Sequence, residues 1–235
     1  MNGFADRTAK ALGADVLSKL GNHRFCVVGC GGAGGNFAEL LVRTGATMLD
    51  LVDGSDVKRS GLNRVFAYSD SDCGVNKTAA LAKRLESIRP NLSIRQFPTH
   101  FRTPEQSVDD SQGDTDVWLA VATAYAVFIA VDERDSRLAV ERFCLKEGSG
   151  RFLSCGIRVD AANDDFQFEC HWRPKSPAKG VDHYDGYGPE NASFGSIVVE
   201  ATSIAFTMLL NHLRDPNSDF VSYYRRYDGA FRPIE

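Results

Sequence analysis

The chain has 235 residues, of which 43% are hydrophobic and 25% charged, and its formal net charge is -4. This length and composition allow one domain with a full hydrophobic core. The mildly acidic balance excludes a broad basic surface of the kind that binds nucleic acid. The first ten residues are polar and charged, and no apolar run reaches the roughly 18 residues of a membrane span. We therefore expect a cytoplasmic protein that does not contact a membrane.

The cysteines are spread along the chain and form no C-x-x-C pair. There are six of them, at positions 26, 30, 73, 144, 155 and 170. This spacing favours neither a disulfide scaffold nor a structural zinc site, so we expect reduced thiols and no zinc.

The first half of the chain alternates between predicted strands and predicted helices. Apolar periodicity and turn residues predict a leading helix over residues 9–20 ended by Gly21, a strand at 24–28, a helix at 36–44 closed by Gly45, a strand at 47–52, a polar, turn-rich segment at 54–76, a helix at 77–88 and a strand at 93–97. This order is typical of parallel strands joined by helices.

The second half changes character. We expect a surface loop or short helix at 103–116, a strand at 126–131 preceded by a helix or an extra strand, a helix at 136–146, a hairpin of strands 152–158 and 165–172 across the turn 161–164, a mobile loop within 173–195, a buried helix at 196–213 and a polar tail from 215. The predicted fold is therefore α/β and Rossmann-like, with a mostly parallel sheet continuing into antiparallel strands and helices on both faces. We expect one domain over residues 1–235, in which residues 1–22 are the leading helix.

A glycine-rich turn joins the first predicted strand to its helix. Gly29, Gly31 and Gly34 fit the G-x-G-x-x-G spacing, and Asp53 follows Gly34 by 19 residues, where a carboxylate can reach a ribose hydroxyl. The amides of such a turn and the dipole of the helix attract phosphate. The alternative is a turn that only packs a strand on a helix, with Asp53 capping the next turn.

The residues after Asp53 favour a triphosphate over a dinucleotide. Asn63 and Arg64 bring an amide and a cation to the same side of the sheet as the glycine turn, and Lys77 opens the next helix. Two cations suit the charge that develops at an attacked phosphorus, and a dehydrogenase has no use for them. Either cation alone is typical of a solvated surface. Asp132, at a predicted strand end, suits Mg²⁺ held against phosphates, and its alternative role is a helix cap before Arg137.

These residues, in this order, resemble the superfamily of ThiF, MoeB and the ubiquitin-activating enzymes. The motifs are Gly29-Cys30-Gly31-Gly32-Ala33-Gly34, Asp53 with Asp56, Leu62-Asn63-Arg64, Gly74-x-x-Lys77 and Asp132 with Arg137. The resemblance implies an enzyme that binds ATP and Mg²⁺ and adenylates a carboxylate with release of pyrophosphate. It assigns nucleotide binding to Gly29, Gly31, Gly32, Gly34, Asp53, Asp56, Asn63, Arg64 and Lys77, magnesium to Asp132, and catalysis to Arg64, Lys77 and Asp132.

The resemblance also implies a homodimer, in which Arg7 of the N-terminal segment reaches the partner's site. Two of the chain's departures from the family concern cysteine. It lacks the paired zinc cysteines of many relatives, and residues 180–195 contain no acceptor cysteine. A thioester or persulfide step would have to use Cys170 or Cys73, and each is expected to be an ordinary strand or loop residue. A third departure is Ser60-Gly61-Leu62-Asn63, where relatives often carry a second asparagine.

Several functions remain open at this point. The first is activation of the C-terminal carboxylate of a small ubiquitin-like or sulfur-carrier protein, whose tail crosses the sheet under the loop 173–189. The second follows from a resemblance of residues 3–20, 43–45 and 101–105 to TcdA, which dehydrates threonylcarbamoyladenosine in tRNA; the acidic charge disfavours it. The third is a nucleotide-binding partner subunit without catalysis, and an NAD oxidoreductase comes last.

Overall fold

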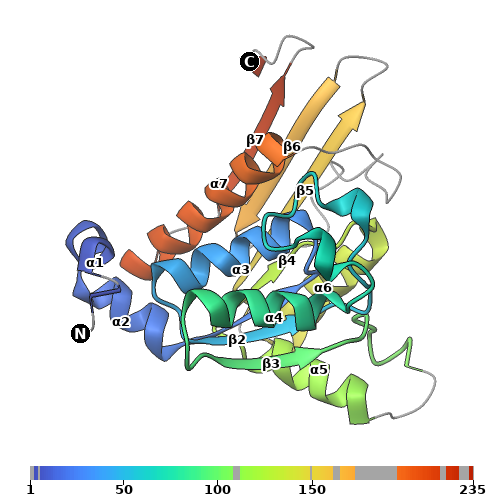
Figure 1. Cartoon of the computed structure of the whole chain (residues 1–235), viewed down its shortest axis with the longest axis horizontal. Coiled ribbons are helices and arrows are strands. Elements are labelled where there is room, and N and C mark those ends of the chain that lie inside the picture. The colour runs from blue at the N-terminus through green and yellow to red at the C-terminus, as the bar shows by residue number, and fades with distance from the viewer. Residues whose placement is uncertain are drawn as a thin grey trace.

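One mixed sheet carries the fold, with strand order β3-β2-β1-β4-β5-β6-β7-β8 over the described part of the chain (Figure 1). The computed structural model describes residues 3–4, 6–107, 112–148, 150–160, 165–172, 195–217, 221–227 and 233–234, with backbone alone for 160, 165–166, 221–227 and 233–234. The strands are β1 Arg24–Val28, β2 Met48–Val52, β3 Ser93–Phe97, β4 Ala126–Ile129, β5 Phe152–Asp160, β6 Asp165–Trp172, β7 Val221–Tyr227 and β8 Pro233–Ile234. The helices are α1 Asp6–Leu12, α2 Ala14–Asn22, α3 Gly32–Thr44, α4 Lys77–Ile88, α5 Gln112–Thr123, α6 Arg134–Lys146 and α7 Gly195–Arg214, with 3₁₀ turns η1 Arg59–Gly61 and η2 Asp70–Asp72.

The parallel half of the sheet brings the predicted motifs to one edge. β1 lies between β2 and β4, and Val28, the last residue of β1, is in register with Val52 and Ile129. The three strands are buried along almost their whole length, as is typical of parallel strands covered on both faces. The glycine turn, Asp53 and the segment that contains Asp132 therefore all leave the sheet at its carboxyl edge, where ligands of open α/β sheets bind.

The other half of the sheet is antiparallel. β5 pairs with β4 in parallel and with β6 in antiparallel fashion, and β7 and β8 extend the sheet from there. The Rossmann-like prediction and the predicted hairpin of two strands are thus confirmed, while the turn 161–164 and the loop 173–194 lie outside the described residues. Within the polar tail from 215, where no strand was predicted, the structure has β7, which pairs with β6.

Helices cover both faces of the sheet, as predicted (Figure 1). α3, α4 and α7 pack on one face, where the ring of Phe37 stacks on that of Phe128 with centroids 3.9 Å apart. α5 and α6 pack on the other face around residues such as Val121 and Val140. α7 is long and apolar enough to cross a membrane by length and composition alone, contrary to expectation. Much of it is buried against α3 and the strands, as in the core helix of a globular domain.

Several boundaries differ from expectation. The leading segment is two helices, because Gly13 has a φ of 86° that ends α1, and α2 runs through Gly21 to Asn22. α3 begins at Gly32, inside the glycine motif. α5 begins at Gln112, inside the acidic segment for which a surface loop or short helix is expected, and Asp114 lies in its first turn, where the helix dipole favours an acid.

Candidate nucleotide site

Two glycines of the motif are required by close packing. Gly29 has a φ of 92°, and a Cβ there would lie 2.5 Å from the carbonyl oxygen of Ala130. A Cβ at Gly34 would lie 1.7 Å from the carbonyl oxygen of Gly29. No side chain fits at either position, so these glycines let β1, β4 and α3 approach one another.

Gly31 is glycine for a different reason. Among the described residues, a Cβ there would meet no atom within 4 Å. Gly31 is also the N-cap of α3, in an extended conformation, and no side chain caps the helix. The start of α3 is therefore open beside Gly31, and an uncapped helix N-terminus with space beside it is suited to binding phosphate.

Asp53 is joined to the glycine turn by hydrogen bonds. Its carboxylate accepts from the backbone N–H of Cys30 and of Ser55, both at 2.8 Å, and only 8% of the residue is exposed. A carboxylate has about four acceptor positions, so these two bonds leave capacity for ribose hydroxyls. The bonds hold Asp53 at the carboxyl edge beside the turn, and its ribose contact stays a prediction.

Lys77 is the first residue of α4, as predicted, and its side chain turns toward Asp53. The ammonium Nζ lies 3.5 Å from Oδ2 of Asp53. The start of α4 is held by Asn76, whose Oδ1 accepts from the N–H of Thr78 at 2.9 Å and whose Nδ2 donates to the carbonyls of Asp53 and Ser55. Asn76 thus fixes the distance between Lys77 and the end of β2.

Arg64 lies over the beginning of α3. A Cβ on Gly32 would be 3.3 Å from Cγ of Arg64, so the arginine stem covers this glycine. The guanidinium donates to the carbonyl of Ser60 at 2.9 Å and to Oδ1 of Asn63 at 3.0 Å. Asn36 of α3 holds the backbone at Arg64 in place, because its Nδ2 donates to the carbonyl of Arg64. The structure therefore brings Asn63, Arg64 and the glycine turn together.

The two remaining acidic residues are both exposed. Asp56 forms a short antiparallel bridge with Asn76. Asp132 lies three residues beyond β4, on the segment that also contacts Gly29. Arg137, which follows it, is buried and donates to the carbonyl of Val131 at 2.8 and 3.3 Å. Arg137 therefore holds the segment that carries Asp132.

The chemistry of these groups suits Mg²⁺ better than a metal held by protein alone. Within the described ranges, no cluster of three or more His, Cys, Asp or Glu residues could hold a metal ion. Mg²⁺ usually binds one or two carboxylates together with substrate phosphates, and Asp132 offers one such carboxylate at the carboxyl edge.

Arg7 does not join the other predicted site residues. It is exposed on α1, which is tied to the end of α7 by a hydrogen bond from Arg214 to the carbonyl of Ala11. The following helix, α2, ends immediately before β1 begins, so this corner of the molecule belongs to the amino edge of the sheet (Figure 1). The contribution of Arg7 to the site of another subunit stays a prediction.

The two candidate acceptor thiols differ in accessibility. Cys170 is fully buried in β6, and its Sγ lies 3.2 Å from the carbonyl oxygen of Ala201 in α7. Burial, together with the neighbouring thiol of Cys155, raises the pKa of Cys170 well above its ordinary value. Cys73 is partly exposed after η2. Cys170 is thus an ordinary buried strand residue. It is unsuited to thioester chemistry, because the reactive species is an accessible thiolate.

Sequence reasoning missed three residues that shape the site: Asn36, Tyr68 and Asn76. Asn76 could have been found, since asparagine directly before a predicted helix is a common N-cap. The hydroxyl of Tyr68 lies 2.7 Å from the carbonyl oxygen of Cys30 and 3.2 Å from that of Lys77. Nothing in the sequence places Tyr68 against the glycine turn.

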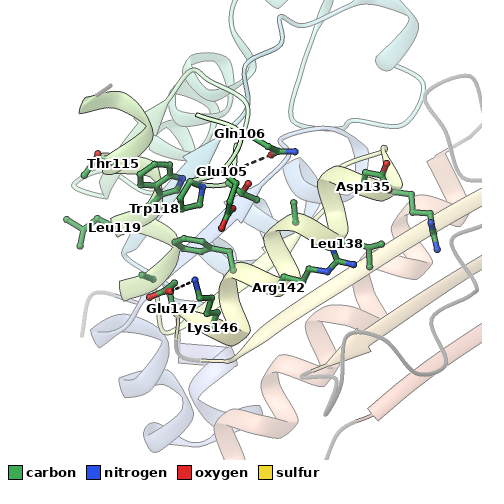
Figure 2. A pocket seen from close by; sticks show the side chains of 16 residues that line it. Glu105, Gln106, Thr115, Trp118, Leu119, Asp135, Leu138, Arg142, Lys146 and Glu147 are labelled. Carbon is green, nitrogen blue, oxygen red and sulfur yellow. Dashed lines mark hydrogen bonds and ion pairs between the residues drawn. The ribbon is translucent and has the colours of Figure 1, made fainter. Parts of the chain in front are cut away.

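A separate cavity of 1040 Å³ lies between α5 and α6 (Figure 2). Trp118 and Leu119 of α5 and Leu138 and Arg142 of α6 line it, together with Glu105 from the segment before α5. None of the predicted site residues lines this cavity.

A family comparison agrees with this geometry. Residues 5–230 match the model of the ThiF family. The chain belongs to the ThiF family.

Curated relatives of this ThiF-family chain include proteins with different substrates. It is 30% identical to ubiquitin-like modifier-activating enzyme 5 of Bombyx mori over 146 residues, which are 60% of this chain and 36% of that protein. It is 28% identical to the tRNA threonylcarbamoyladenosine dehydratase of Escherichia coli K12 over 137 residues, which are 58% of this chain and 47% of that protein. The matches thus span less than half of either relative.

Solved structures with a similar fold cover nearly the whole ThiF-family chain. E. coli MccB with MccA superposes with a TM-score of 0.73 and 16% identity, over 100% of this chain and 71% of that one. E. coli TcdA in complex with AMP superposes with a TM-score of 0.67 and 19% identity, over 91% of this chain and 94% of that one. At these identities the likeness concerns the fold.

Proposed function

We propose that this chain binds ATP at the glycine turn and transfers its adenylyl group to a carboxylate. A carboxylate oxygen attacks the α-phosphorus, the bond from that phosphorus to the bridging oxygen breaks, and pyrophosphate leaves. The product is an acyl-adenylate. The proposal treats residues 1–235 as one adenylation domain.

One observation carries the proposal: the open N-terminus of α3 is surrounded by the groups that a nucleoside triphosphate needs. Gly31 leaves space for phosphates, Asp53 lies at the next strand end, and the cations Arg64 and Lys77 flank the turn. Membership of the ThiF family supports the same assignment, as does the fold shared with E. coli MccB, which has been solved with ATP.

The proposed roles follow from these positions. Asp53 accepts from the ribose hydroxyls, with Asp56 and Asn63 beside the nucleotide, and Arg64 and Lys77 stabilise the charge that develops on the phosphates. Asp132 would hold Mg²⁺, which supplies further charge neutralisation when bound. The attacking carboxylate is already ionised at neutral pH, so catalysis requires orientation and electrostatic stabilisation rather than a general base.

We infer that the activated group is the C-terminal carboxylate of a small ubiquitin-like or sulfur-carrier protein. The similarity to ubiquitin-like modifier-activating enzyme 5 supports this partner. The similarity to the E. coli tRNA dehydratase supports a tRNA substrate as the alternative, and the net charge of -4 disfavours it. Free cysteines suit a reducing, cytoplasmic location.

We further infer a homodimer in which Arg7 of one subunit reaches the nucleotide of the other. The exposed position of Arg7 on α1, at the amino edge of the sheet, supports a role toward a second subunit. Arg7→Ala tests this role, because it should lower pyrophosphate exchange. Mixing with a Lys77→Ala subunit should restore exchange, because the mixed dimer then has one site with Lys77 from one subunit and Arg7 from the other.

ATP–pyrophosphate exchange by the purified protein tests the function. The assay is run alone, with candidate ubiquitin-like or sulfur-carrier proteins and with bulk tRNA. Exchange that requires an intact protein C-terminus supports the first substrate, and a partner lacking its last two residues is the matched control. Release of AMP only with tRNA favours the dehydratase. ATP binding without exchange under any condition favours a nucleotide-binding partner subunit and contradicts adenylation.

A further inference from the structure

The residue between the first two glycines of the motif is held at both ends of its backbone. Cys30 donates its N–H to Oδ2 of Asp53 at 2.8 Å. Its carbonyl oxygen lies 2.7 Å from the hydroxyl of Tyr68, which donates to it. The peptide groups on either side of Cys30 are therefore both oriented by side chains that come from elsewhere in the chain.

Tyr68 is placed for this contact by its own surroundings. It is buried, and its hydroxyl also lies 3.2 Å from the carbonyl oxygen of Lys77, the first residue of α4. The hydroxyl has one proton, and the shorter distance assigns that proton to Cys30. The glycine turn and the start of α4 thus meet at one oxygen atom.

The geometry of a peptide bond converts this contact into an effect on the next residue. In a planar trans peptide, the C=O of one residue and the N–H of the next point in opposite directions. The carbonyl of Cys30 points inward to Tyr68, so the N–H of Gly31 points outward. The structure is open beside this N–H, because a Cβ on Gly31 would meet no atom of the described residues within 4 Å.

We propose that the Tyr68 hydroxyl orients the Cys30–Gly31 peptide so that the Gly31 N–H faces the phosphates of the nucleotide. Tyr68 is thus a positioning residue that touches neither the nucleotide nor the substrate. The inference rests on the proposed function, since it takes the glycine turn to be the phosphate site.

The donor remains available over the working range of pH. Burial, with the nearby Cys30, Asp53 and Asp72, raises the pKa of Tyr68 well above its ordinary value. The hydroxyl therefore stays protonated. Without it, the described residues provide no other donor for the Cys30 carbonyl, and the peptide could rotate and withdraw the Gly31 N–H.

Tyr68→Phe tests the inference because it keeps the buried ring and removes only the hydroxyl. We expect ATP affinity, measured by calorimetry, to fall on the order of tenfold, the effect of one lost buried hydrogen bond. Affinity for adenosine, which has no phosphate, should be unchanged. Tyr125→Phe is the matched control, because Tyr125 stacks on His23 away from the turn and should leave both affinities as in the wild type.

Two results would overturn the inference: wild-type ATP affinity in Tyr68→Phe, or an equal loss of ATP and adenosine binding. A second measurement needs no nucleotide. The NMR resonances of the Cys30 carbonyl carbon and the Gly31 amide should both shift in Tyr68→Phe, and unchanged resonances contradict the proposal. If the wild type binds no ATP, the proposed function fails, and these resonances alone decide the role of Tyr68.

Discussion

The ammonium of Lys77 lies 3.5 Å from the carboxylate of Asp53, so the cation expected to face phosphate is paired with the residue expected to hold ribose. Asp53 also accepts two backbone hydrogen bonds, from Cys30 and Ser55. Its orientation therefore does not depend on Lys77. The lysine can turn to a phosphate oxygen while Asp53 keeps its place, so the pair preserves charge balance in the site before a nucleotide arrives.

Lys77→Ala should abolish activation and leave the fold intact. We expect pyrophosphate exchange to fall at least about 100-fold, because a cation on the transferred phosphate stabilises the transition state by several kcal/mol. A partly exposed ion pair contributes at most about 1 kcal/mol, so the thermal midpoint should change little. Lys83→Ala, an exposed lysine on the same helix, is the control. Wild-type exchange by Lys77→Ala would remove Lys77 from the catalytic set.

Asp132→Ala should also abolish activation at unchanged stability, for a different reason. Asp132 is exposed, and the segment that carries it is held by the buried Arg137 rather than by its own carboxylate. We expect the dependence of exchange on Mg²⁺ concentration to shift to much higher concentrations. Asp135→Ala, an exposed carboxylate in the first turn of α6, should behave as the wild type. An unchanged Mg²⁺ titration for Asp132→Ala would contradict the proposed magnesium ligand.

The sequence predicted the parallel strands and the start of α4 closely, because their signals are local. Buried runs such as β1 have a continuous apolar pattern, and the helix that Lys77 opens has apolar residues at helical spacing. The glycine turn was predictable for the same reason, since its spacing lies within one short segment. The hydrogen bond from Tyr68 to Cys30 joins residues 38 positions apart, and no local pattern encodes it.

The sequence pattern also did not predict the buried carboxylate in β2. Asp50 is completely buried in mid-strand, where it pairs with Arg24 at 2.9 Å and Arg95 at 2.6 Å. An alternating pattern would place such a carboxylate on a solvent-exposed face. Its arginines come from the two neighbouring strands, so only the strand order β3-β2-β1 explains it. Features that need the order of strands cannot be deduced from periodicity.

The ion pairs of Glu39 give a pH-dependent contribution to stability. Burial alone would raise the pKa of Glu39, but hydrogen bonds from Arg84 and Arg43 outweigh it, and the pKa is lowered. Between the folded-state pKa and the higher unfolded-state pKa of Glu39, the unfolded chain therefore binds more protons at this position than the folded chain does. The stabilisation is complete above the unfolded-state pKa and is lost as pH falls through the folded-state pKa.

Glu39→Gln should accordingly lower the free energy of unfolding by at most about 1 kcal/mol near pH 7. The difference from the wild type should shrink as the pH falls from 7 toward 3, because the wild-type carboxylate is protonated as the pH passes through its lowered folded-state pKa. Urea unfolding at the two pH values measures this. Glu86→Gln, exposed on α4, should show no such dependence on pH. An equal difference at both pH values would mean that packing, not charge, is responsible.

Gly31→Ala and Gly34→Ala separate the glycine required by the ligand from the glycine required by the fold. A Cβ on Gly34 would overlap the carbonyl oxygen of Gly29 at 1.7 Å, so Gly34→Ala should destabilise the protein by at least about 3 kcal/mol or prevent folding. A Cβ on Gly31 would meet no atom within 4 Å in the part of the chain that the structure describes, so Gly31→Ala should unfold at the wild-type temperature.

The two variants should also differ in binding. The new methyl group of Gly31→Ala occupies the space through which phosphates approach the amides of α3, so ATP affinity should fall at least about tenfold while adenosine affinity stays constant. Calorimetry with both ligands and thermal unfolding of the same samples measure the two effects. If Gly31→Ala bound ATP as the wild type does, the phosphates would lie elsewhere, and the first turn of α3 would have only a structural role.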